Sequence, residues 1–99
     1  MKNKKHALEG DEHGFVWYCT DYTIGGTIEV YHQGYLDLDG LPGTIAVCYR
    51  LEDGACAEWA IPWRYWLSCE DFTANERMAL ERMLINNERI IMDTVRGLI

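Results

Sequence analysis

The stretch around which the chain is organised covers residues 73–99 and reads TANERMALERMLINNERIIMDTVRGLI. Its first residues fit a capping box, in which the Thr73 hydroxyl and the Glu76 carboxylate each accept a hydrogen bond from a backbone N–H that the first helical turn leaves unpaired. Side chains then recur at spacings of three and four, which places them on one helix face. We therefore predict one continuous amphipathic helix over residues 74–98, whose inner face comprises Leu80, Leu84, Asn87, Ile91, Val95 and Leu98.

A second row on the same helix is spaced by seven residues and contains Met78, Ile85, Met92 and Ile99. Seven-residue spacing is typical of a seam between two packed helices. One interpretation is that this row packs against residues 63–72 of the same chain. The other is that Met78, Ile85 and Met92 form the seam of a homodimer or of a contact with a partner, to which methionine would lend adaptable packing.

Five segments before the helix have the composition and alternation of β-strands: residues 15–22, 27–33, 35–38, 44–51 and 55–61. Glycine-rich turns at Gly25-Gly26, Gly34 and residues 39–43 separate the first four. Asp53-Gly54 is a strong hairpin signal between the last two. Pro62 ends the fifth strand. Residues 63–72 fit either a short helix or an irregular connection.

These elements predict an α+β fold, in which an antiparallel meander sheet of four to five strands is covered on one face by the long C-terminal helix. Residues 1–13 are expected to form a flexible tail, and residues 14–99 a single domain. A two-residue Asp53-Gly54 turn would pair Tyr49 with Glu58 and Cys48 with Trp59. Both faces of that hairpin are apolar, so the face away from the helix needs a cover: residues 63–72, a second subunit or a client protein.

Charge is segregated along the chain, whose formal net charge is −7. Three lysines lie in the first five residues, and the acids and arginines of the helix balance. Residues 6–73 hold twelve acidic residues against only Arg50 and Arg64. Such a field attracts basic surfaces and repels nucleic acid, which argues against direct nucleic-acid binding.

No arrangement of residues indicates a metal centre or cofactor site. The four cysteines, Cys19, Cys48, Cys56 and Cys69, form no C-x2-C pair, and the three histidines show no ligand spacing. Without an export signal, free thiols in a reducing cytoplasm are expected, and no segment is long and apolar enough to span a membrane.

Two arrangements of residues could support catalysis, but the sequence favours a protein that is not an enzyme over both. Cys19 could act as a nucleophile beside His13 or His32, but acidic surroundings raise the pKa of a thiol. Asp37 and Asp39 could form a carboxylate pair, although solvated loop acids are the commoner case. We therefore expect the protein not to be an enzyme and to require no cofactor.

The leading hypothesis is a cytoplasmic binding protein that offers an acidic, Trp/Tyr-rich surface to a basic partner protein, with indoles receiving cations. In size, charge and single compact domain, the chain resembles the small acidic inhibitor proteins of phages, including anti-CRISPR proteins. That resemblance implies a nucleic-acid mimic acting in the host cytoplasm against a nucleic-acid-handling complex. The alternative is a homodimeric structural or assembly protein that uses the helix seam. The candidate partner-binding residues are Glu29, Asp37, Asp39, Glu52, Asp53, Glu58, Trp59 and Trp63.

Overall fold

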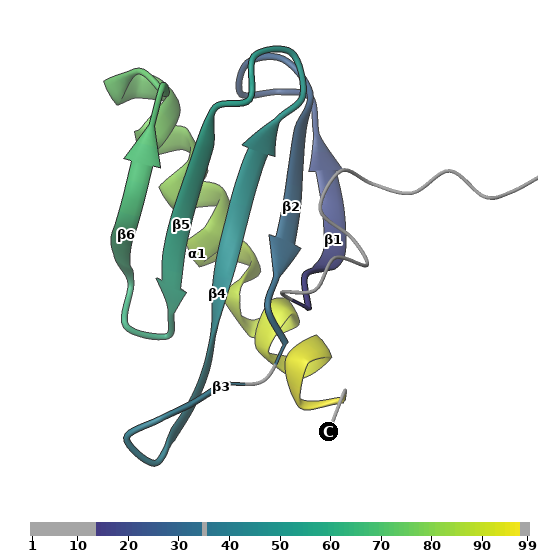
Figure 1. Cartoon of the computed structure of the whole chain (residues 1–99), viewed down its shortest axis with the longest axis vertical. Coiled ribbons are helices and arrows are strands. Elements are labelled where there is room, and N and C mark those ends of the chain that lie inside the picture. The colour runs from purple at the N-terminus through teal and green to yellow at the C-terminus, as the bar shows by residue number, and fades with distance from the viewer. Residues whose placement is uncertain (1–13, 35, 98–99) are drawn as a thin grey trace, which may run out of the picture.

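The computed structural model describes residues 14–34 and 36–97, which form one six-stranded antiparallel sheet with a single long helix across one face (Figure 1). This arrangement confirms the predicted α+β fold, with one strand more than the four to five expected. The predicted tail and the last two residues lie outside the described part. The elements are β1 (Val16–Asp21), β2 (Ile28–His32), β3 (Leu36–Leu38), β4 (Leu41–Arg50), β5 (Cys56–Ile61), β6 (Tyr65–Glu70) and α1 (Ala74–Arg96).

The sheet is a meander in the order β1-β2-β4-β5-β6, and β3 pairs with the first residues of β4. Every pairing is antiparallel. The β1–β2, β4–β5 and β6–α1 connections therefore emerge at one end of the sheet, and the β3–β4 hairpin and the β5–β6 turn lie at the other (Figure 1). Because the connections lie alternately at the two ends of the sheet, they determine which charged residues share an end.

The sixth strand corrects the interpretation of residues 63–72, most of which form β6 rather than a helix or an irregular connection. The register shifts between Glu58 and Trp59, which leaves Leu67 as an extra residue on β6. Trp66 and Cys69 consequently both pack against the helix-covered core although they are three residues apart. A bulge of this kind breaks the two-residue period by which a strand is recognised in a sequence.

The β4–β5 hairpin has the predicted faces but a different register. The Arg50 N–H donates to the Ala55 carbonyl at 2.9 Å, so residues 51–54 form a four-residue loop. Tyr49 pairs with Cys56 and Cys48 with Ala57, two residues away from the predicted pairing. Because side chains alternate with a period of two, a shift of two residues leaves every side chain on its predicted face.

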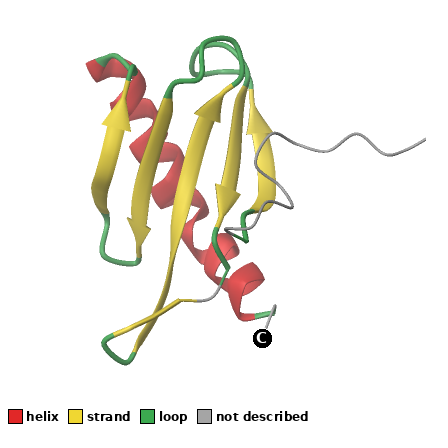
Figure 2. Cartoon of the chain, in the orientation of Figure 1, coloured by secondary structure: helices red, strands yellow, loops and turns green. Residues whose placement is uncertain are grey.

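The core lies between the sheet and α1, which crosses the sheet diagonally (Figure 2). Leu80, Leu84, Ile91 and Val95 are fully buried, as the helical spacing predicts. The capping box is also confirmed: the Glu76 N–H donates to Thr73 Oγ1 at 3.1 Å, and the Thr73 N–H donates to Glu76 Oε1 at 2.9 Å. The sheet side of the core consists of Ile28, Val30, Ala46, Cys48, Ala57, Trp59 and Ile61.

Polar contacts along the helix fix its position on the sheet. Glu81 accepts a hydrogen bond from Trp66 Nε1 at 3.1 Å, and Glu88 pairs with Arg64 at 3.0 Å. On the inner face, Tyr18 Oη donates to Asn87 Oδ1 at 3.1 Å, which satisfies the one polar residue of the predicted apolar row. These contacts come from β1, β6 and the β5–β6 turn, so they hold the helix from both edges of the sheet.

A buried histidine on β2 predicts a pH-dependent stability. His32 is 1% exposed, and its Nδ1 accepts a hydrogen bond from the Gly34 N–H at 3.0 Å. Burial lowers the pKa of His32 below its ordinary value of 6.5. As the pH falls below that value, the unfolded chain binds a proton that the folded protein does not, so the free energy of unfolding decreases.

We expect chemical denaturation midpoints to fall between pH 7.5 and pH 5, and we expect His32→Asn to remove much of that fall. Asparagine offers an oxygen that can still accept from Gly34 but has no titrating group. Other titratable groups remain in both proteins, so the difference between the two pH profiles isolates His32. Parallel profiles for the two proteins would contradict the assignment.

Candidate interaction surface

Six carboxylates gather at the end of the molecule where the β1–β2, β4–β5 and β6–α1 connections meet (Figure 1). We call this region the acidic end. Among the described residues, Arg50 and Arg77 belong to it, and Arg82 of α1 lines a pocket together with Asp21. Its carboxylates are Asp21, Glu52, Asp53, Glu70, Asp71 and Glu76.

Arg50 joins the three connections at the centre of the acidic end. Its guanidinium lies 2.9 Å from Asp53 and 3.0 Å from Glu76. It also donates to the Gly25 carbonyl at 3.3 Å and to the Asp71 carbonyl at 3.2 Å, and it stacks 4.9 Å above the Phe72 ring. The Arg50 side chain is only 12% exposed, and its positive charge is paired with carboxylates of the same chain.

The hydrogen bonds at the acidic end stabilise the ionised form of its carboxylates. The Arg50 guanidinium is the main cause that lowers the pKa of Asp53 to about 2. Hydrogen bonds from Thr27, backbone first, lower the pKa of Glu52. The backbone N–H of Thr73 lowers the pKa of Glu76, with Arg50 adding to the effect. These three carboxylates therefore keep their negative charge well below neutral pH.

Two apolar side chains accompany the acids. Tyr22 in the β1–β2 connection is 72% exposed, and Leu51 in the β4–β5 loop is 45% exposed. Glu70 and Asp71 are also exposed, and no described residue forms an ion pair with either. The acidic end thus combines accessible carboxylates with an aromatic and an aliphatic contact.

The opposite end of the molecule is nearly balanced in charge. There four acids, Asp37, Asp39, Glu88 and Asp93, lie at the same end as three arginines, Arg64, Arg89 and Arg96. Two of the predicted partner-binding carboxylates, Asp37 and Asp39, therefore belong to a different surface from Glu52 and Asp53. The ten residues of β4 separate the two pairs. The structure brings Glu52 and Asp53 together, but it does not unite the predicted set.

The remaining predicted partner-binding residues lie on the strands or in the core. Glu29 is 6% exposed and accepts a hydrogen bond from the Tyr31 hydroxyl. Glu58 is half-buried and accepts from Ser68 Oγ at 3.4 Å. Trp59 is 2% exposed with its ring edge-on to Trp66, which corrects its assignment to a partner surface. An indole enclosed by the helix and its own sheet has no area left for a partner.

Trp63 is half-buried and lies against Gly43, where an added Cβ would clash with its ring. Among the described residues, Tyr22 is the large aromatic side chain that the acidic end exposes, so this end is not rich in Trp and Tyr.

Sequence reasoning missed Asp21, Glu70, Asp71 and Glu76 as members of one surface. The signal was present, because Asp21 and Glu70 end strands, Asp71 directly follows one, and Glu76 lies in the first turn of the helix. In a meander, every second connection lies at the same end, so acids at alternate connections share that end of the sheet. Because residues 63–72 were interpreted as a helix or a connection and not as a strand, the β6–α1 connection was not recognised as the third one at this end.

The predicted dimer seam is not continuous. Met78 is 58% exposed and Ile85 is half-buried, but Met92 is 6% exposed and belongs to the core. The three side chains therefore differ in accessibility along the row, and Met92 is taken up by intramolecular packing. A helix–helix seam of the predicted length would require Met92 to leave that position.

None of the four cysteines has an environment that would activate its thiol as a nucleophile. All four are unpaired, and burial raises the pKa of each thiol. For Cys19, the nearby Asp21 adds to the effect of burial. A raised pKa lowers the fraction of nucleophilic thiolate. Among residues 14–34 and 36–97, no three His, Cys, Asp or Glu side chains gather as metal ligands would.

A scan against models of protein families and searches of curated proteins and of solved structures found no match to this chain. Within the described part of the chain, no helix is both long enough and apolar enough to cross a membrane.

Proposed function

We propose that this protein is a non-enzymatic binding protein that presents its acidic end to a basic surface of a partner protein. The partner class that suits this surface is a protein whose basic groove holds nucleic acid, so that carboxylates take the place of phosphates. The resemblance in size and charge to small phage inhibitor proteins supports the same class of partner. The site of action would be the cytoplasm of the cell that holds the partner.

The observation that carries this proposal is that six carboxylates lie at one end of the sheet, where Arg50 is already paired with Asp53 and Glu76. A field of one sign, concentrated on one surface, speeds association with an oppositely charged surface and orients it. Tyr22 and Leu51 would add apolar area at the contact. The opposite end, with nearly balanced charge, would face away from the partner.

Affinity capture with matched charge variants tests the proposal. The first variant, Glu70→Gln with Asp71→Asn, removes two exposed charges from the acidic end. The control, Asp39→Asn with Asp93→Asn, removes two exposed charges from the opposite end. Asp71 and Asp39 both have positive φ, 67° and 56°, which asparagine accepts readily. The fold should survive in both variants, as circular dichroism would verify.

Each protein is immobilised, exposed to a cell lysate at low salt and eluted with rising salt, and the eluted proteins are identified by mass spectrometry. We expect the wild type and the control to retain basic proteins that elute together as salt screens the contact. The acidic-end variant should lose them. Retention that is equal in both variants, or that resists high salt, would contradict the proposed contact.

A further inference from the structure

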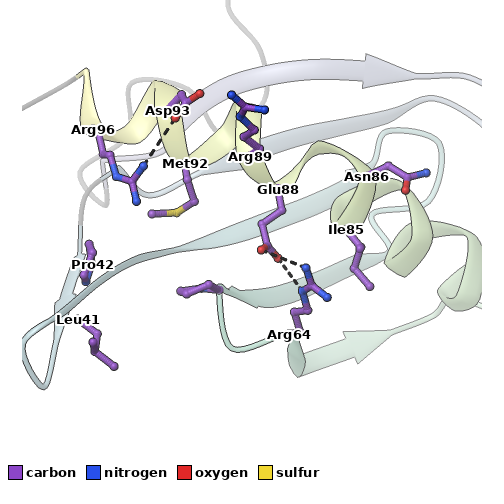
Figure 3. A pocket seen from close by; sticks show the side chains of 11 residues that line it. Leu41, Pro42, Arg64, Ile85, Asn86, Glu88, Arg89, Met92, Asp93 and Arg96 are labelled. Carbon is purple, nitrogen blue, oxygen red and sulfur yellow. Dashed lines mark hydrogen bonds and ion pairs between the residues drawn. The ribbon is translucent and has the colours of Figure 1, made fainter.

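A cavity of about 470 Å³ lies between the C-terminal half of α1 and two connections of the sheet (Figure 3). Leu41 and Pro42 contribute one wall from the start of β4, and Pro62 and Arg64 contribute another from the β5–β6 turn. The helix closes the third side. This volume lies within the range of about 300–1,000 Å³ that is usual for small-molecule sites.

The lining is apolar where the three elements meet. Leu41, Pro42, Pro62, Ile85 and Met92 form this part of the cavity. Figure 3 shows Ile85 and Met92 pointing from the helix toward the sheet. Neither proline has a backbone N–H, so the walls offer few donors to water. Leu41 is 53% exposed, so a ligand in the cavity would remove apolar surface from water.

The cations at the rim differ in how firmly they are held. Arg64 is fixed by Glu88 through two hydrogen bonds of 3.0 and 3.3 Å. Arg96 lies 3.7 Å from Asp93, beyond hydrogen-bond distance, and both side chains are more than half exposed. Arg96 can therefore exchange this weak contact for an anionic group of a ligand. Arg89 points away from the cavity in Figure 3 and adds positive potential at the rim.

The lining also limits what the cavity can do. It contains no histidine, cysteine, serine or threonine, so it offers no nucleophile and no base that titrates near neutral pH. The residues around it include three arginines and two acids, whereas the acidic end has an excess of acids. The combination of an apolar lining with an exchangeable guanidinium at one end fits a ligand with an apolar body and one anionic head.

We propose that this cavity binds a small amphipathic monoanion, with its apolar body against Leu41, Pro42 and Met92 and its head on Arg96. This site is distinct from the acidic end and does not depend on the proposed partner contact. The ligand class is that of medium-chain carboxylates, and decanoate is a suitable probe.

The test is a titration of the full ¹⁵N-labelled chain with decanoate, followed by two-dimensional NMR of the amides. We expect saturable shifts confined to residues that line the cavity. Decyltrimethylammonium, which has a similar chain and the opposite charge, should shift these amides far less at equal concentration. Arg96→Gln should weaken decanoate binding about tenfold, because it removes a charge-assisted hydrogen bond.

Two further variants test whether binding depends on Arg96 specifically and on the apolar wall at Leu41. Arg82→Gln removes an exposed arginine from the same helix outside this cavity and should leave the affinity unchanged. Leu41→Asn removes apolar area from an exposed wall position and should weaken binding. The proposal is overturned by shifts spread over the whole protein, by equal affinities of wild type and Arg96→Gln, or by equal binding of the cationic probe.

Discussion

Replacing Gly43 with alanine is expected to lower the free energy of unfolding by about 3 kcal/mol. A Cβ at this buried position would lie 2.5 Å from the Ile61 carbonyl oxygen and closer still to the Trp63 ring. The ring can rotate away, but the carbonyl belongs to the backbone of β5, so the two neighbouring strands must separate. For a domain of this size the expected loss corresponds to a fall in melting temperature of more than about 10 °C, which differential scanning calorimetry would measure.

Gly97→Ala is the matched control for this prediction. Gly97 caps α1 with a φ of −70°, and an added Cβ would meet its nearest atoms at 3.5 Å, which is ordinary contact. We expect its melting temperature to remain close to that of the wild type. A similar small change for Gly43→Ala would show that β4 and β5 are less closely packed at Gly43 than the structure indicates.

Arg50→Met is expected to destabilise the fold by about 2–4 kcal/mol. The substitution preserves much of the apolar stem but removes the guanidinium that joins β4, the β1–β2 connection, the β6–α1 connection and the first turn of α1. Glu76 and Asp53 would then face each other's charge without a cation between them. Urea denaturation at neutral pH measures the change in free energy.

Arg64→Met is the control for Arg50→Met, since Arg64 also pairs with a carboxylate through two nitrogens. The Arg64 side chain is 52% exposed, whereas that of Arg50 is 12% exposed. Water replaces the lost contact at an exposed site, so a much smaller shift in the urea midpoint is expected. Equal shifts for the two variants would contradict the central role of Arg50.

The lowered pKa values at the acidic end agree with this view of Arg50. The Asp53 carboxylate has a folded pKa below its unfolded one, so it contributes stability that is present above the unfolded pKa and is lost as the pH falls toward about 2. In Arg50→Met the main cause of that lowered pKa is gone. The stability of the variant should therefore depend less on pH in the acidic range than that of the wild type.

Local sequence patterns predicted the secondary structure of most of the chain, because contacts between neighbouring residues are sufficient to define it there. Thr73 and Glu76 define the start of α1 through a capping box that involves only neighbouring residues. The three- and four-residue spacing of Leu80, Leu84 and Ile91 defines its buried face for the same reason. Gly34 and Pro62 end strands by their own backbone constraints.

The sequence was less informative where two distant segments fix each other's position. The predicted turn over residues 39–43 contracts to Asp39 and Gly40, because Leu41, Pro42 and Gly43 pair with β3. The register of β4 against β5 was shifted by two residues, since Asp53 accepts hydrogen bonds from Arg50 and from the Ala55 N–H and so occupies a longer loop. The bulge at Leu67 concealed β6 in the same way.

The candidate interaction surface depends on tertiary structure even more than the strand register does. Asp21, Glu52 and Glu70 are far apart in the sequence, and nothing in their local context distinguishes them from Asp37 or Glu58. They lie at one end of the sheet because successive antiparallel strands return the chain to that end, which the pairing of six strands decides. Local composition could therefore predict an acidic protein, but only the path of the chain could decide where its charge is concentrated.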